Sequence, residues 1–277
     1  WEAGQRLGER VIRDLLQQPF DAWALPEHFR DAFRTTLLDT TLDPALKAQT
    51  LTLPSEGYIA GQIGHDVDPV AIHLAREFLR RTLAEALTLE LEACYGQHRD
   101  QGPYEFSAYA MGRRALQNLC LAYLIESGQE SARQRAQSQL DEANNMTNAM
   151  GALQALNQID STERDQALAG FYERWREDVL VVNKWLGLQA MSKVPGSLAR
   201  VRVLMEHEAF DMRNPNKVRA LIGSFCAGNP AQFHAEDGSG YAFLGEQVKV
   251  LNELNPQIAA RLVQPLSRWR LYDKPRQ

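Results

Sequence analysis

Six histidines are the residues of this chain best suited to holding a metal ion, because imidazole is the commonest metal ligand in proteins. A helical zinc-hydrolase motif needs two histidines four residues apart, with a glutamate after the first to act on water. Only His207 is followed by a glutamate, Glu208, and Asp211 stands where the second histidine would be. No histidine has a glutamate three residues before it, which excludes the Glu-x-x-His pairs of a di-iron bundle. The sequence therefore predicts neither a metal site nor a catalytic residue in this chain.

Three of these histidines are assigned positions that do not involve a metal. We expect His73 and His207, which lie in helical patterns, at the surface or at a helix cap. His234 comes just before the Gly-rich segment 237–240. We expect it to hydrogen-bond that loop, and a position facing a cavity is the alternative.

Ser239 is the serine whose surroundings come nearest to a nucleophile motif. It lies between Gly238 and Gly240, but a nucleophile elbow needs glycine at position 237, which is Asp237. A dinucleotide-binding fingerprint would need glycine where Phe243 stands. The Asp-Gly-Ser-Gly segment is therefore predicted to be a tight turn.

The three cysteines, Cys94, Cys120 and Cys226, are odd in number, widely spaced and set in apolar helical patterns. No Cys-x-x-Cys pair occurs, so neither a zinc knuckle nor a disulfide framework is indicated. We expect buried, reduced thiols in a cytoplasmic protein.

The composition describes an ordinary globular protein of 277 residues, with 44% hydrophobic and 23% charged residues. No run approaches the ~18 apolar residues of a membrane span. The net charge of −5 argues against a nucleic-acid partner, and the basic residues near the end have no aromatic platform between them. The chain begins at Trp1 with no leader, and we expect both ends to have been cut from a longer polypeptide.

Helix after helix is predicted along the chain, with short polar connections. Five Asp-Pro or Asn-Pro pairs mark helix starts, since the first residue caps the helix and proline suits its first turn: 43–44, 68–69, 214–215, 229–230 and 255–256. Residues 69–97 contain no internal proline and are expected to form the longest helix. The β-branched run 179–182 leads directly into helical spacing. The chain is thus predicted to be all-α, a superhelix of stacked antiparallel hairpins of the HEAT/armadillo kind, forming one domain over residues 1–277.

Residues 214–244 contain the clearest local pattern. After the Asn214 cap, Val218, Leu221, Ile222 and Phe225 recur at helical spacing, so one face of this helix is predicted to be buried. Arg219 lies just off that apolar face. A guanidinium group carries a planar fork of donors that matches a carboxylate, and it stays charged near neutral pH.

Together with this block, four other segments resemble one known family, in order along the chain: Leu51-Thr-Leu-Pro-Ser-Glu56, Glu142-Ala-Asn-Asn-Met-Thr-Asn148, Val182-Asn-Lys-Trp185, and Asn255-Pro-Gln257 through Arg261-Leu262. Each string is weak alone, whereas five collinear ones across nearly the whole chain are specific. The chain resembles the C-terminal helical domain of the bacterial aminopeptidase N family, which are zinc-dependent metallopeptidases of the gluzincin kind.

The resemblance implies a superhelix that closes over the catalytic domain of the same polypeptide, with zinc held by that other domain. It also implies that Arg219 and Arg261 project from inner helices toward a peptide-binding cavity, where they would hold the carboxylate end of a short peptide. The alternative is that each arginine pairs with a neighbouring acid, such as Asp237 or Glu246, and ties adjacent hairpins together. Arg213 and Arg268 are assigned only this structural role.

The leading hypothesis is therefore a non-catalytic domain of a zinc aminopeptidase that encloses the active site and binds the distal end of peptide substrates. The fragment alone lacks the zinc motif and is expected to be inactive. A free-standing helical-repeat scaffold that binds a protein partner on its concave face is the second hypothesis. The residue preference at the peptide amino terminus is not encoded here.

Overall fold

The computed structural model describes residues 1–99 and 102–277, and within these ranges the secondary structure consists of helices joined by turns and short irregular segments. The one β-type pairing in these ranges is an isolated parallel bridge between Val67 and Tyr272. Backbone contacts divide the chain into two compact units. Unit 1 comprises Trp1–Ser55 and Leu74–Leu156, and unit 2 comprises Glu56–His73 and Asn157–Gln277. The all-α prediction is confirmed.

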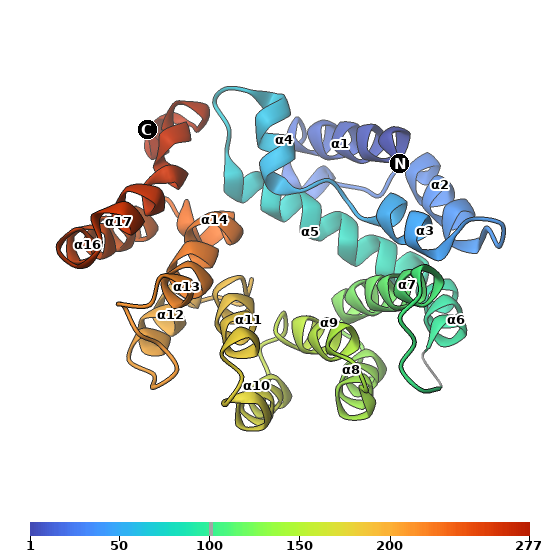
Figure 1. Cartoon of the computed structure of the whole chain (residues 1–277). Helices are drawn as coiled ribbons and strands as arrows, with labels where there is room; N and C mark the ends of the chain where they lie inside the picture. Colours follow the sequence, from blue (N-terminus) through green and yellow to red (C-terminus); the bar gives the residue numbers. More distant parts are fainter. Residues whose placement is uncertain (100–101) are drawn as a thin grey trace. The chain divides into compact units, whose positions relative to one another are not determined.

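Unit 1 is built from helices that pack on their neighbours in the chain, such as α6 on α7 and α8 on α9 (Figure 1). Helix α5 (Pro69–Ala86) begins in unit 2 and continues into unit 1. The other elements of unit 1 are α1 (Glu2–Leu16), η1 (Phe20–Ala22), α2 (Glu27–Leu38), α3 (Pro44–Leu51), α6 (Thr88–His98), α7 (Ala108–Leu124), η2 (Ile125–Ser127), α8 (Glu130–Glu142) and α9 (Met146–Leu156).

Unit 2 combines one early segment of the chain with its whole C-terminal half. Its elements are α4 (Glu56–Ile63), the first turn of α5, α10 (Thr162–Trp175), α11 (Val179–Ala190), α12 (Ser197–Met205), α13 (Pro215–Val218), the π-helical turn η3 (Arg219–Gly223), α14 (Ser224–Gly228), α15 (Pro230–Phe233), α16 (Ser239–Leu254), α17 (Pro256–Leu262), η4 (Gln264–Leu271) and η5 (Lys274–Arg276). The β-branched run at the start of α11 is helical, as predicted.

The predicted helix starts are confirmed, and four of the five use the expected side-chain cap. Asp43, Asp68, Asn214 and Asn255 each accept a hydrogen bond from a backbone N–H of the first helical turn. Asn229 differs, because its amide donates instead to the carbonyls of Ala190 and Ser192, at 3.0 and 2.9 Å. It therefore ties the start of α15 to the end of α11 and does not cap its own helix.

A single continuous helix over residues 69–97 was a wrong prediction, because the helix breaks at Leu87. There the backbone has φ −123° and ψ 24°, so α5 ends and α6 starts with a new direction. The Thr88 hydroxyl donates to the Ala84 carbonyl at 2.6 Å, a side-chain bond that competes with regular helical pairing. The break contains no proline or glycine, which is why the sequence pattern did not reveal it.

The apolar face predicted for residues 218–225 is fully buried in unit 2. Val218, Leu221, Ile222 and Phe225 all have zero exposure. Edge-to-face contacts of Phe225 with two other buried rings, Phe233 and Phe243, join this stretch to α15 and α16. This shared core holds the π-helical turn against the neighbouring helices.

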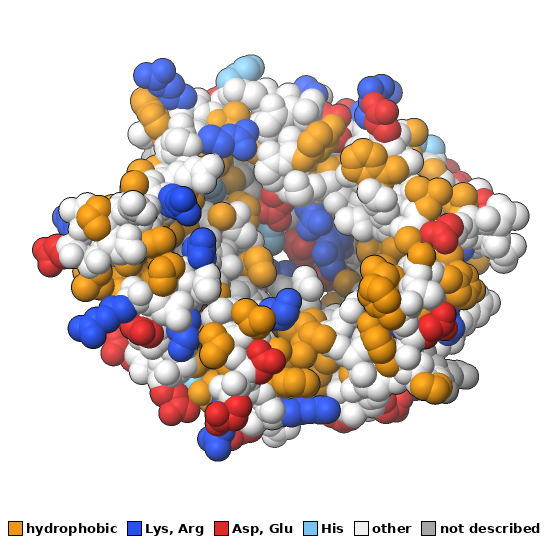
Figure 2. Space-filling model, viewed as in Figure 1, with side chains coloured by type: hydrophobic (Ala, Val, Ile, Leu, Met, Phe, Trp, Pro, Cys, Tyr) orange, Lys and Arg blue, Asp and Glu red, His pale blue; other side chains and the backbone are white. Residues whose placement is uncertain are grey.

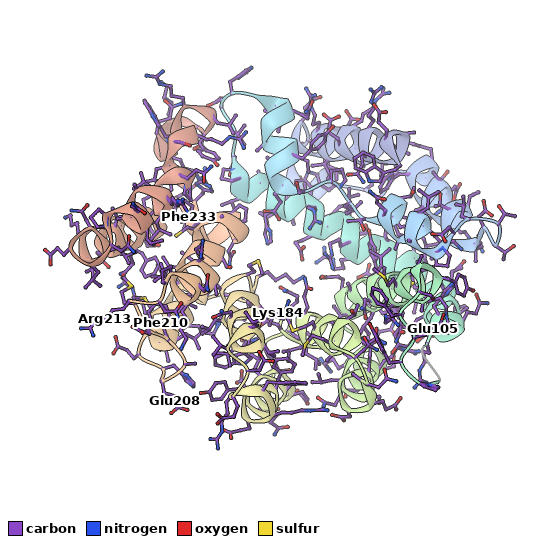
Figure 3. All side chains as sticks on the ribbon, in the orientation of Figure 1. Glu105, Lys184, Glu208, Phe210, Arg213 and Phe233 are labelled. Atoms are coloured by element: carbon purple, nitrogen blue, oxygen red, sulfur yellow. The ribbon has the colours of Figure 1, made fainter. Side chains whose placement is uncertain are left out.

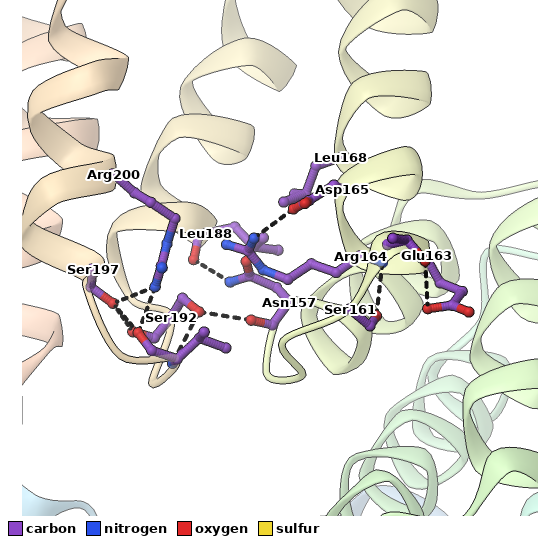
Figure 4. A network of polar contacts seen from close by, with 12 residues as sticks. Asn157, Ser161, Glu163, Arg164, Asp165, Leu168, Leu188, Ser192, Ser197 and Arg200 are labelled. Carbon is purple, nitrogen blue, oxygen red and sulfur yellow. Dashed lines mark hydrogen bonds and ion pairs between the residues drawn. The ribbon is translucent and has the colours of Figure 1, made fainter.

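A buried polar network stabilises the turns between α9 and α12 (Figure 4). The Asn157 amide donates to the Leu188 carbonyl, and the Ser192 hydroxyl donates to the Asn157 carbonyl, both at 2.7 Å. Ser197 then donates to the Ser192 carbonyl at 2.6 Å. Because these backbone groups lie away from water, each needs such a partner, and the network links the connection before α10 to the end of α11 and the start of α12.

Among the helices described, none combines the length and the apolar character that crossing a membrane would require.

Candidate functional site

Unit 2 contains a cavity of about 630 Å³. Its wall is formed by the starts of α4 and α5, by the stretch α13–η3–α14, by the region around α15, and by α17 with η4. The volume falls within the range of sites that hold small ligands. The family resemblance predicted a cavity near Arg219 and Arg261, and both residues line this one.

Much of the cavity lining is apolar. The side chains of Ile72, Val218, Cys226, Ile258 and Leu262 all contribute to it. Burial raises the pKa of the Cys226 thiol to about 12, so this sulfur is a neutral thiol near neutral pH. Since the thiolate is the nucleophilic form, Cys226 is suited to packing and not to covalent catalysis.

Arg219 begins the π-helical turn η3, which is an uncommon element that recurs at functional sites. Gly187 in α11 allows this close packing, because a Cβ there would lie 3.1 Å from the Ala220 carbonyl oxygen. The exposed Arg219 side chain donates to the Asn216 side-chain oxygen at 2.5 Å. Within residues 1–99 and 102–277 it forms no ion pair, and Glu246, its predicted alternative partner, pairs with Arg202 at 2.8 Å.

Arg261 and Arg268 complete a set of three arginines around the cavity. Arg261 is exposed in the last turn of α17, and Arg268 is exposed in η4. The Arg268 guanidinium lies over Gly61 of α4, where a Cβ would be 3.4 Å from its Nη2 atom. Among the described residues neither arginine has an ion-pair partner. Both guanidinium groups are therefore free to contact a ligand.

Glu56 supplies the one carboxylate of the lining within the described ranges. Its Oε1 atom lies 2.8 Å from Nδ1 of His73, and both side chains are largely buried. His73 was expected at a surface or a cap, and it lies instead inside this pair. On the face shown in Figure 2, basic and acidic side chains are interspersed, whereas the cavity lining contains three arginines and, among the described residues, one carboxylate.

His234 also lines the cavity, at the end of α15. Only 6% of it is exposed, and its Nδ1 atom lies 2.8 Å from the Tyr241 hydroxyl oxygen. Burial, assisted by the nearby charge of Arg276, lowers the pKa of this imidazole to about 4. His234 is therefore neutral near neutral pH. The alternative expectation applies, since His234 lines the cavity, and the ring partner is Tyr241 of α16, the residue that follows the predicted 237–240 loop.

Arg276 fixes the segments on which His234 and Tyr272 stand. Its side chain is 1% exposed, and its Nε atom donates to the His234 carbonyl at 2.7 Å. Its terminal nitrogens pair with Asp273 and, at 3.2 Å, with Asp68, the cap of α5. This buried cation thus joins the connection before α5 to the C-terminal segment. A backbone bridge between Val67 and Tyr272 joins the same two segments, and Tyr272 also lines the cavity.

The remaining sequence candidates lie outside the cavity. The His207 ring packs against Tyr172 and Trp185, and its Nδ1 atom accepts the Ala209 N–H at 3.0 Å. Arg213 is exposed at the edge of the molecule, whereas Phe233 is buried in the core of unit 2 (Figure 3). The predicted buried thiols are confirmed, since all three cysteines are free and buried.

The Gly-rich segment 237–240 forms the predicted tight connection into α16, and its last two residues, Ser239 and Gly240, already belong to that helix. Gly238 has a φ of +70°, a conformation that favours glycine, and the Asp237 carboxylate accepts the Ser239 N–H at 2.9 Å. At Gly240 a Cβ would lie 2.2 Å from the Phe233 carbonyl oxygen, so only glycine fits there.

Comparison with known proteins agrees with this architecture. The family described as DUF3458_C, a domain of unknown function with ARM repeats, matches residues 1–277. The chain belongs to this family. DUF3458_C domains are thus helical-repeat domains, which confirms the repeat architecture predicted from the sequence.

Relatives of this DUF3458_C chain are aminopeptidases. Aminopeptidase N of Escherichia coli (strain K12) is 43% identical over 282 residues, covering 100% of the chain and 32% of the relative. Aminopeptidase N of Caulobacter vibrioides is 37% identical over 98% of the chain and 31% of the relative. The crystal structure of Legionella pneumophila aminopeptidase A in complex with aspartic acid has a TM-score of 0.88 at 30% identity, over 99% of this chain and 33% of that one.

These matches confirm the resemblance to the C-terminal domain of aminopeptidase N, and the chain spans about a third of the length of the curated relatives it matches. In the part that the structure describes, no three His, Cys, Asp or Glu side chains are placed to hold a metal ion.

Sequence reasoning found two of the three cavity arginines and missed the third. Arg268 was assigned a purely structural role, yet it lines the same cavity as Arg219 and Arg261. Its segment η4 is irregular, and the residue has no apolar periodicity around it that would indicate a face. Glu56 and Tyr272 were missed for the same reason, because only the fold brings these distant segments together.

Proposed function

We propose that this domain is the non-catalytic C-terminal part of a zinc aminopeptidase, and that its cavity binds the distal end of short peptides. The observation that supports this most directly is the pair Arg219 and Arg261 at one partly apolar cavity, without a carboxylate partner among the described residues. A guanidinium fork in such a place matches a peptide carboxylate. Apolar walls beside it would accept peptide side chains.

In this proposal the rest of the polypeptide supplies the zinc ion and the chemistry, and the catalytic domain of the same chain is the partner of this domain. Binding the far end of a peptide would orient its amino terminus for cleavage, which contributes positioning and not bond breaking. The domain would also enclose the active site and exclude folded proteins. We further propose that residues 1–277 act as one helical-repeat domain and that the enzyme is cytoplasmic.

The test compares free-acid and amidated forms of the same short peptides in the complete enzyme. Arg219→Ala and Arg261→Ala should each lower kcat/KM for the free acids by about tenfold and leave the amides nearly unchanged. The lower end of the range for a charge-assisted hydrogen bond is expected, because both side chains are exposed. Lysine at either position should restore only part of the loss, since it keeps the charge but not the fork.

Arg213→Ala is the matched control, because Arg213 is exposed and lies outside the cavity. It should leave both substrate forms unaffected. Equal losses on free acids and amides in the cavity variants would instead indicate structural damage. That result would favour the second hypothesis, in which the domain is a scaffold that binds a protein partner.

A further inference from the structure

The cavity carries more positive charge than one peptide carboxylate needs. Three arginines, Arg219, Arg261 and Arg268, line it, whereas Glu56 is the one carboxylate that the described residues contribute. Glu56 is already engaged with His73 at 2.8 Å. In the proposed function Arg219 and Arg261 bind the terminal carboxylate of the peptide, so no anion has yet been proposed for Arg268.

Arg268 is placed to receive such an anion. Its guanidinium lies against α4 at Gly61, and its charge acts on the hydroxyl of Tyr272. Burial raises the pKa of the Tyr272 hydroxyl, and the charge of Arg268 opposes that rise. The guanidinium therefore faces a neutral phenol and bare helix backbone. Within residues 1–99 and 102–277 it has no carboxylate partner.

Open space adjoins this arginine on the surface of α4. Gly57 lies one helical turn before Gly61, on the same side of the helix, and it also lines the cavity. A Cβ placed on Gly57 would meet no atom within 4 Å. The neighbouring lining residue of α4, Ala60, is small as well. A side chain of the ligand can therefore enter beside α4 and approach Arg268.

We infer that Arg268 recognises a second carboxylate, so that the cavity selects peptides with an acidic side chain, Asp or Glu, near their distal end. The inference rests on the proposed function, because the ligand is a peptide only if this domain serves an aminopeptidase. Arg219 and Arg261 hold the terminal carboxylate, and Arg268 holds the carboxylate of the side chain. The ion pair forms in the bound ground state, so its effect falls on KM more than on kcat.

The experiment uses the complete enzyme and peptides of three to six residues that end in Glu or in its neutral isostere Gln, each as free acid and as amide. The Glu peptides should have a kcat/KM about three- to tenfold higher than the Gln peptides, mostly through KM, as expected for a partly exposed ion pair. The preference should shrink when the salt concentration rises from about 0.05 M to about 0.5 M, because salt screens exposed charges.

Two variants and one control locate the effect. Arg268→Gln should bring the ratio of Glu to Gln peptides close to one, whereas Arg270→Gln should preserve it, because the neighbouring Arg270 packs on Trp269 and does not line the cavity. Gly57→Leu keeps every charge but fills the space beside α4, and it should weaken the preference too. These positions are exposed, so folding should tolerate the changes.

Equal kcat/KM for Glu and Gln peptides at every length would overturn the inference, as would a preference that survives in Arg268→Gln. The comparison of free acids with amides reports separately on the proposed function. If free acids are favoured but Glu and Gln peptides behave alike, only the role of Arg268 is wrong. If neither distinction is found, both the inference and the proposed function fail.

Discussion

The rings of His234 and Tyr272 lie against each other, with 4.1 Å between their centroids. One face of the imidazole therefore contacts an aromatic ring, while its Nδ1 atom is engaged with Tyr241. Water reaches this histidine poorly, and Arg276 places a positive charge beside it. Burial and the charge of Arg276 disfavour the protonated imidazole, so the cavity has a neutral wall next to its arginines.

The buried histidine makes the stability of the chain depend on pH. The folded protein takes up the His234 proton only near pH 4, whereas the unfolded chain takes it up near the ordinary pKa of 6.5. The unfolded state therefore binds more protons as the pH falls from about 6.5 to about 4. Across that window this one group should lower the free energy of unfolding by about 3 kcal/mol.

Urea unfolding of wild type and His234→Gln at several pH values measures this effect, because the contributions of all other groups cancel in the difference. The variant should lose less stability than the wild type below pH 6.5. An NMR titration that gives His234 an ordinary pKa would contradict the prediction.

Arg276 should be important for the stability of unit 2. Arg276→Met removes a nearly fully buried cation and leaves Asp68 and Asp273 without their shared partner. The expected loss is about 2 kcal/mol, below the usual cost of breaking a fully buried pair because Asp68 is partly exposed. Arg270→Met is the control, and as a surface change it should stay within about 0.5 kcal/mol. Equal unfolding midpoints for the two variants would refute the role given to Arg276.

Two glycines of α16 provide a matched pair for the packing of that helix. Gly240→Ala forces a Cβ toward the Phe233 carbonyl oxygen and should destabilise the protein by about 1–3 kcal/mol. Gly245→Ala meets no atom within 4 Å and should stabilise the helix by about 0.5 kcal/mol. Thermal unfolding followed by circular dichroism measures the change in midpoint for both variants. A neutral Gly240→Ala would mean that α15 and α16 can move apart at no cost.

The isolated chain should contain no stoichiometric zinc and should not hydrolyse aminoacyl-nitroanilides, because it lacks a zinc-binding motif and a catalytic base. Metal analysis and an activity assay on the purified chain test this. One tightly held zinc ion per chain, with activity that contamination does not explain, would contradict the assignment of catalysis to the rest of the polypeptide.

Features that depend on residues close together in the sequence could be predicted, whereas contacts between distant segments could not. Caps such as Asp43 and Asn255 act on N–H groups two or three residues away, so their helices could be placed from local spacing alone. The burial of Phe225 followed equally from helical periodicity. Arg219 and Arg261 were found through the resemblance, since an exposed arginine has no signature of its own.

The rest depended on contacts between distant segments. The approach of Arg268 to Gly61 and the burial of Arg276 beside Asp68 join residues far apart in the chain. No periodicity or spacing encodes such contacts. The break at Leu87 was missed for another reason, because leucine is a good helix former and the buried Leu87 continues the apolar pattern of the helix.

The discontinuity of unit 2 sets an order of events during protein synthesis. Residues 56–73 leave the ribosome early, but Val67 pairs with the backbone of Leu271 and Asp273, and Asp68 pairs with Arg276. Every helix of unit 1 from α5 to α9 is translated before those partners exist. The early segment therefore stays without these partners until residues 271–276 have been translated. A nascent chain stalled before residue 271 would contain all of unit 1, but Val67 in unit 2 would lack its backbone partners. Val67 and its neighbours would then be the segment most accessible to chaperones and proteases.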